Sequence, residues 1–108
     1  MSVVTFADIQ DFAAELAHEF LPEKVILFGS YATGTAGEES DVDLLVVMPG
    51  DASGVRVAAD IIMRLKPTLP VELIVRSSRQ IKERLALNDY FLRDIMSTGK
   101  ELYAAPHH

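Results

Sequence analysis

The sequence contains no cysteine, so it can form neither a disulfide bond nor a thiolate metal site. A bound metal would be held by oxygen atoms or imidazole, which favours hard cations. No apolar run approaches the ~20 residues needed to cross a bilayer. The N-terminus has neither the basic segment nor the apolar stretch of a signal peptide. These absences predict a cytoplasmic protein without membrane contact.

Basic residues are scarce in the first half of the chain. Residues 1–51 hold ten acidic side chains and one basic one, and the whole chain has a net charge of −6. Proteins that grip long nucleic acid rely on a surplus of Lys and Arg, so we expect no such binding. Four bases lie close together later in the chain, at Arg76, Arg79, Lys82 and Arg84. This cluster fits either a solvated helix face or a patch for a triphosphate or an acidic partner.

The length and composition suit one hydrophobic core. The chain has 108 residues, of which 49% are hydrophobic, too few for two domains with separate cores. We therefore predict a single domain over residues 1–103 and a tail over residues 104–108. The paired His107 and His108 are typical of an expression-tag remnant and take no part in the predicted chemistry.

The spacing of apolar residues predicts alternating helices and strands. Helical spacing and capping residues predict helices over residues 6–19, 55–65, 77–87 and 90–97. Short apolar runs predict strands over residues 25–28, 42–47 and 71–75, with a weaker signal at 101–103. This order predicts an α/β (α+β) fold, in which helices pack on a small mixed central sheet of three to four strands.

Carboxylates accompany two of the apolar strands. Asp41 and Asp43 leave the same face of an extended segment, with Cα atoms about twice the ~3.3 Å residue rise apart, so both can reach one ion. Glu72 reaches that face if its strand is a neighbour. Because buried carboxylates need a cation or a hydrogen-bond partner, the three together predict a site for one or two hard cations. The alternatives are a capped strand entry for the Asp pair and an edge-strand carboxylate facing solvent for Glu72.

Gly29 and Ser30 follow the first predicted strand. Glycine lets the backbone approach a ligand closely, and serine adds a hydroxyl. The N–H groups that open a turn or short helix over Tyr31-Ala32-Thr33 would point outward. These features predict a phosphate-binding arrangement, with Asp41 brought opposite Ser30 by the returning loop. A simple turn is the alternative for Ser30.

The spacing of these residues resembles a known signature. Gly29-Ser30, the stretch Tyr31 to Ser40, then Asp41-Val42-Asp43 and a later apolar-Glu-apolar strand are similar to the pattern of nucleotidyltransferases in the DNA polymerase beta superfamily. Within it, the chain resembles the minimal nucleotidyltransferases (MNT proteins), small bacterial and archaeal polypeptides often encoded beside a HEPN-domain protein. The resemblance runs from about Val25 to Tyr103.

The resemblance implies a polymerase-beta-like fold and a magnesium-dependent enzyme. Gly29 and Ser30 would contact the nucleotide, with Ser30 on the β- and γ-phosphates of ATP or another nucleoside triphosphate. Asp41 and Asp43 would hold two Mg²⁺ ions, and Glu72 would be the third carboxylate, near the attacking hydroxyl. That position is often Asp in the family, and Glu72 is one methylene longer. The implied reaction transfers a nucleoside monophosphate, AMP in the case of ATP, to a hydroxyl group.

The resemblance also implies the acceptor. A HEPN ribonuclease toxin would receive the nucleotide, and this chain would act as its antitoxin. Two other functions stay open: a catalytically silent antitoxin that binds and occludes its HEPN partner, and a transferase that acts on a small-molecule hydroxyl. The intact motif residues favour an enzyme.

Overall fold

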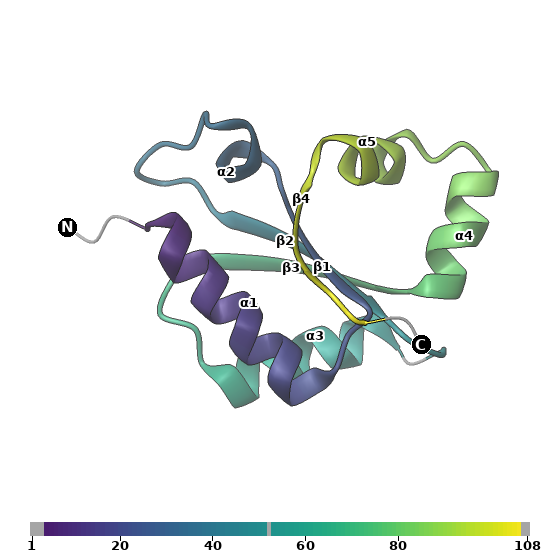
Figure 1. The fold of residues 1–108 in the computed structure, drawn as a ribbon, viewed down its shortest axis with the longest axis horizontal. Coiled ribbons are helices and arrows are strands. Elements are labelled where there is room, and N and C mark those ends of the chain that lie inside the picture. Colours follow the sequence, from purple (N-terminus) through teal and green to yellow (C-terminus); the bar gives the residue numbers. More distant parts are fainter. Residues whose placement is uncertain (1–3, 52, 107–108) are drawn as a thin grey trace.

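The computed structural model describes residues 4–51 and 53–106, in which five helices surround a four-stranded sheet (Figure 1). The order is α1 (Phe6–Phe20), β1 (Lys24–Phe28), α2 (Ser30–Thr33), β2 (Val42–Met48), α3 (Gly54–Leu65), β3 (Val71–Ser77), α4 (Ser78–Ala86), α5 (Tyr90–Thr98) and β4 (Lys100–Ala104). Every predicted helix and strand is present close to its predicted bounds, including the weakly signalled last strand. None of the helices in this part of the chain has the length and apolar character that a membrane span requires. His107 and His108 lie outside the described residues.

The sheet is mixed, as predicted. Its strands lie in the order β3-β2-β1-β4, with β1 antiparallel to β2 and β4, and with β2 parallel to β3. The parallel pair is joined through α3, because parallel strands need a crossover rather than a tight turn. The predicted α/β (α+β) class is therefore confirmed, and β3 and β4 form the two edges.

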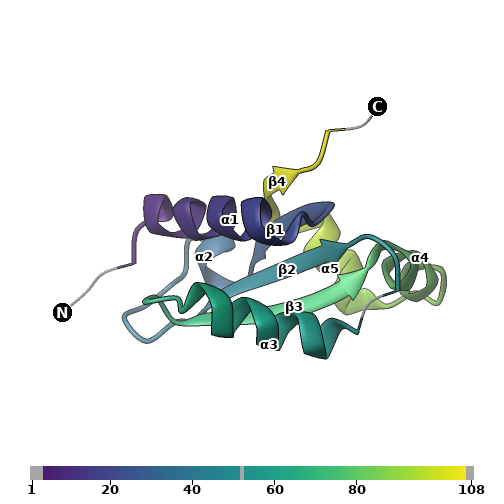
Figure 2. The same ribbon diagram turned by 90° about the horizontal axis from the view of Figure 1, so that it is seen from below.

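Helices cover both faces of the sheet (Figures 1 and 2). On one face, α1 and α3 pack through Leu16 and Ile61 against Leu44 of β2. On the other face, α4 and α5 pack through Ile81 and Leu92 against a second cluster that includes Leu45 and Val47 of β2. This two-sided burial explains why β2 reads as an almost continuous apolar run instead of an alternating one.

Local signals fix where the helices begin. The Thr5 hydroxyl accepts a hydrogen bond from the Asp8 N–H, and the Asp8 carboxylate accepts one from the Thr5 N–H at 2.9 Å, which together form a capping box. These hydrogen bonds lower the pKa of Asp8. A second capping box, between Ser77 and Gln80, starts α4.

Gly99 ends α5 for a reason that the sequence does not reveal. Its φ of −69° is open to any residue, so the left-handed conformation common at helix ends is not needed here. Instead, a Cβ at this position would collide with the Ile95 carbonyl and the Ile26 side chain. The glycine allows α5 to pack closely on β1.

Candidate active site

The end of β1 lies beside the start of β2. Phe28, the last residue of β1, is opposite Asp43 in the antiparallel register, so Gly29 follows next to the Asp43 side chain. Gly29 has a φ of +76°, and a Cβ there would overlap the Oδ2 atom of Asp43. Only glycine satisfies both the backbone conformation and the close approach.

The turn after Gly29 is the short helix α2. Its N–H groups are less available than the sequence suggested, because those of Ala32 and Thr33 both donate to the Gly29 carbonyl at 3.1 Å. Among the described hydrogen bonds, the N–H groups of Ser30 and Tyr31 have no acceptor. The expectation that the N–H groups opening this turn point outward is therefore wrong for Ala32 and Thr33, whose N–H groups close the turn itself.

The strands β2 and β3 bring two of the predicted carboxylates together. Asp43 is the direct neighbour of Glu72 in the parallel register, and neighbouring residues of paired strands project from the same face. Asp41 precedes β2, where the Val42 N–H donates to the Pro70 carbonyl at 2.7 Å. The pairing of these two strands, on which the Glu72 interpretation depends, is present, whereas the metal-binding and catalytic roles of these side chains stay predictions.

The burial of these carboxylates differs from what the sequence suggested. Asp43 is half-buried, but Asp41 and Glu72 are exposed. The α4–α5 layer covers the middle of the sheet face, where it packs on Leu45 and Val47. The N-terminal ends of β2 and β3 are therefore left facing solvent. The sequence argument that burial of all three carboxylates demands a cation is therefore wrong for Asp41 and Glu72.

The electrostatics of the site centre on Asp43. Burial raises the pKa of this carboxyl, and the negative charges of Glu72 and Asp41, with the close approach of the Glu72 side chain, raise it further. Within the described residues, none of these three carboxylates forms an ion pair with a basic side chain. The structure thus assembles like charges without an internal counter-charge.

The oxygen donors of this cluster fit a hard divalent cation in their chemistry. Over residues 4–51 and 53–106, however, no three His, Cys, Asp or Glu side chains are gathered closely enough to hold an ion as they stand. Asp41 and Glu72 are exposed, so neither side chain is fixed in place by surrounding core residues. Glu72 already approaches Asp43, so a three-carboxylate site would need all three side chains to gather more closely than they do here.

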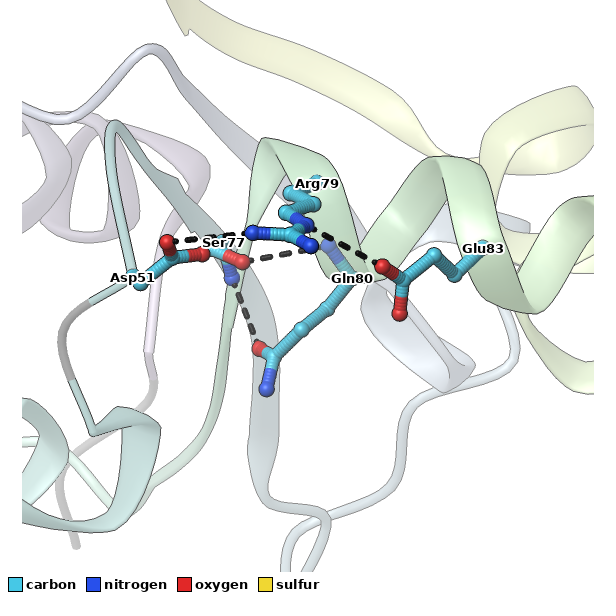
Figure 3. Close-up of polar contacts among 5 residues, drawn as sticks. All are labelled: Asp51, Ser77, Arg79, Gln80 and Glu83. Atoms are coloured by element: carbon cyan, nitrogen blue, oxygen red, sulfur yellow. Dashed lines mark hydrogen bonds and ion pairs between the residues drawn. The ribbon is translucent and has the colours of Figure 1, made fainter.

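The basic cluster at residues 76–84 does not act as one unit. Two of its arginines make separate contacts with different acidic residues. Arg79 contacts Glu83 at 3.2 Å and Asp51 at 3.4 Å, beside the Ser77–Gln80 capping box (Figure 3). These contacts lie on an exposed surface, so they support the solvated-face interpretation for Arg79.

A cavity of about 530 Å³ lies between β3, α4 and α5, and we call it the α4–α5 groove. Its lining includes Ile74 and Arg76 of β3, Arg84 of α4, and Asp89 and Phe91 at the start of α5. Phe91 was not singled out from the sequence, since an aromatic residue beside an apolar helix stripe gives no signal of its own.

Comparisons with known proteins match most of the chain. A family model described as the nucleotidyltransferase domain matches residues 9–101. A curated protein of Methanocaldococcus jannaschii, named putative protein adenylyltransferase, is 36% identical over 83 residues, which are 75% of this chain and 78% of that protein.

Solved structures show the same fold. The crystal structure of a putative nucleotidyltransferase from Sulfolobus solfataricus superposes with a TM-score of 0.57 at 29% identity, covering 72% of this chain and 70% of that one. Two toxin-antitoxin crystal structures, one with AMP-PNP and one of an MntA-HpeT mutant, give TM-scores of 0.53 and 0.52 at 20% and 18% identity. Each covers 89% of this chain and 73% of the solved chain, and at these identities the likeness concerns the fold alone.

Proposed function

Because this chain belongs to the nucleotidyltransferase domain family, we propose that it is a magnesium-dependent transferase that places AMP from ATP on a hydroxyl of a partner protein. The observation that carries the proposal is the position of Asp43, which has Gly29 on one side and Glu72 on the other. Three separate motif positions thus meet at one point. The name of the M. jannaschii relative supports a protein acceptor.

The partner is proposed to be a HEPN toxin, with this chain as its antitoxin. The resemblance to MNT proteins supports this, and so does the fold shared with two toxin-antitoxin structures, one of which contains AMP-PNP. The modified hydroxyl would then come from the partner chain.

In the proposed reaction, Gly29 and Ser30 contact the triphosphate and the carboxylates surround the reacting centre. The acceptor oxygen attacks the α-phosphorus, the bond to pyrophosphate breaks, and Glu72 takes the acceptor proton. When bound by Asp41, Asp43 and Glu72, Mg²⁺ would offset the triphosphate charge and lower the pKa of the acceptor hydroxyl. The loop at Gly29 would hold the nucleotide against Asp43.

The test is transfer of label from α-labelled ATP, with Mg²⁺, to the protein encoded beside this chain. Wild type should label that protein, and Asp43→Asn should label it at least about a hundredfold more slowly, because the variant removes a charge at the reacting centre. Asp60→Asn is the matched control, since Asp60 is exposed on α3, across the sheet from the site.

Three results would replace the proposal. Equal labelling by wild type and Asp43→Asn would remove the carboxylate site from the reaction. Tight binding of the partner without labelling would favour the silent antitoxin. Labelling of an aminoglycoside without a protein partner would favour the small-molecule transferase.

A further inference from the structure

We propose that the α4–α5 groove binds a segment of the acceptor protein whose carboxylate lies about four residues from the modified hydroxyl. The inference rests on the proposed function, because it concerns the substrate of the same site. Arg76 of the groove would bind that carboxylate.

The groove begins next to the candidate active site. Phe91, on its wall, packs edge-to-face on Phe28, with ring centroids 5.8 Å apart. Phe28 is opposite Asp43 in the sheet register. On the other strand, Ile74 lines the groove two residues after Glu72, on the same face of β3. An acceptor segment with its hydroxyl at the carboxylates and its chain along β3 would therefore enter the groove.

The groove presents one guanidinium without an acidic partner. Arg84 pairs with Asp89 at 3.0 Å, so these two charges offset each other. Arg76 forms no ion pair with any described residue, and its Nη1 donates to the Val75 carbonyl at 2.9 Å. Because Arg76 is exposed and has further N–H donors, it can bind an incoming carboxylate through a charge-assisted hydrogen bond.

The strand geometry sets the spacing. Arg76 is four residues after Glu72 on the same face, which at ~3.3 Å per residue places the two Cα atoms roughly 13 Å apart. An extended acceptor segment covers that distance in about four residues. The triphosphate is a poor candidate for the ligand of Arg76. Ser30, the proposed phosphate contact, follows the C-terminal end of β1, and β1 is two strands away from β3. Arg76 is level with the other end of β1, at Lys24.

The test uses labelled peptides that contain one hydroxyl residue, either serine or tyrosine, and a single glutamate two, four or six residues away. Binding to the full chain, with Mg²⁺ and AMP-PNP present, is measured by fluorescence anisotropy against matched glutamine peptides. The four-residue spacing should bind most tightly. Arg76→Gln should weaken the binding of that peptide roughly threefold to tenfold, to the affinity of the matched peptide that carries glutamine instead of glutamate.

Two further variants make the result specific. Lys82→Gln removes the same charge from a part of α4 that does not line the groove, and it should leave binding unchanged. Arg76→Glu should favour a lysine peptide over the glutamate peptide at the same spacing. This reversal cannot come from a variant that merely fails to fold.

The inference is overturned if glutamate and glutamine peptides bind equally at every spacing, or if Lys82→Gln weakens binding as much as Arg76→Gln. Weaker AMP-PNP binding by Arg76→Gln, with unchanged peptide binding, would assign Arg76 to the nucleotide and also overturn it. Binding is measured without turnover, so it can be read even if no peptide is labelled. Peptides that bind through Arg76 but never receive label would count against the transferase proposal alone.

Discussion

The backbone of Gly29 lies directly against the carboxylate of Asp43, and a Cβ at position 29 would overlap the Oδ2 atom of Asp43. The same glycine has a φ of +76°, which side-chain-bearing residues rarely adopt. The residue proposed to contact phosphate therefore touches the carboxylate proposed to bind metal, so a change in one displaces the other.

Gly29→Ala should lose both stability and activity. Gly50→Ala is the matched control, because Gly50 also has a φ of +76° but a Cβ there meets nothing within 4 Å. The control should cost about 1–2 kcal/mol of unfolding free energy from the positive φ alone. Gly29→Ala should cost more and slow label transfer at least about tenfold, because Asp43 must move. Denaturant unfolding and the transfer assay measure the two effects. A Gly29→Ala protein with wild-type transfer would contradict the close contact.

Asp43→Asn should stabilise the metal-free protein at neutral pH. The pKa of Asp43 is raised by burial and by the charges of Glu72 and Asp41. A carboxyl with a raised folded-state pKa contributes stability below its unfolded pKa of about 4, and this contribution is lost as the pH rises through the folded-state pKa. With EDTA present, the variant should therefore have the higher Tm at about pH 7. The difference should vanish toward about pH 4 and below, and a constant difference would show that the cause is not titration.

Added Mg²⁺ should reverse that order. A cation that binds the folded state alone raises its Tm by mass action. Wild type and the Asp60→Asn control should therefore gain stability with millimolar Mg²⁺, whereas Asp43→Asn should gain little. Thermal unfolding with and without nucleotide gives this result independently of turnover. Equal gains in all three proteins would place the Mg²⁺ site elsewhere.

Asp89→Ala should destabilise the protein in a pH-dependent way. The Asp89 carboxylate accepts a hydrogen bond from the Leu92 N–H at the start of α5 and pairs with Arg84, and these contacts lower its pKa. The stability they give is present above the unfolded pKa and is lost as the pH falls through the folded-state pKa. The Tm deficit of the variant should therefore shrink in acid. Asp94→Ala, an exposed change on the same helix, is the matched control for the loss of a carboxylate.

Gly99→Ala should destabilise the core without any backbone strain. Its φ of −69° suits alanine, but the added Cβ would meet Ile26 and the Ile95 carbonyl. Overpacking of this kind costs about 1–3 kcal/mol. Denaturant unfolding measures the loss, and a neutral result would mean that α5 can move away from β1 freely.

The secondary structure was predictable because its signals are local. The Thr5–Asp8 capping box starts α1, and the apolar run of β2 reflects a strand covered on both faces. The weak signal at residues 101–103 was also correct, and β4 pairs with β1. Each of these signals depends on a few neighbouring residues and needs no knowledge of strand order.

The environment of the carboxylates was not predictable in the same way. Whether Glu72 is buried depends on where α4 and α5 lie over the sheet, and nothing near residue 72 determines that. Glu72 is exposed on an edge strand and is also the register neighbour of Asp43, so its predicted role at a metal site stays a prediction. The hydrogen bonds of the Ala32 and Thr33 N–H groups were not predicted either. Both groups donate to the Gly29 carbonyl, because so short a helix forms its own backbone hydrogen bonds before it offers donors to a ligand.

The antiparallel pairing of β1 with β2 has a consequence for the order of folding. Gly29, Ser30 and Asp43 belong to one hairpin, so they meet through contacts between residues close in sequence. Glu72 arrives only when β3 pairs in parallel with β2, after the α3 crossover. Short loops close at a smaller loss of entropy than long ones, and parallel pairs form slowly. We therefore expect Gly29, Ser30 and Asp43 to come together early, and Glu72 to join them in one of the slower steps.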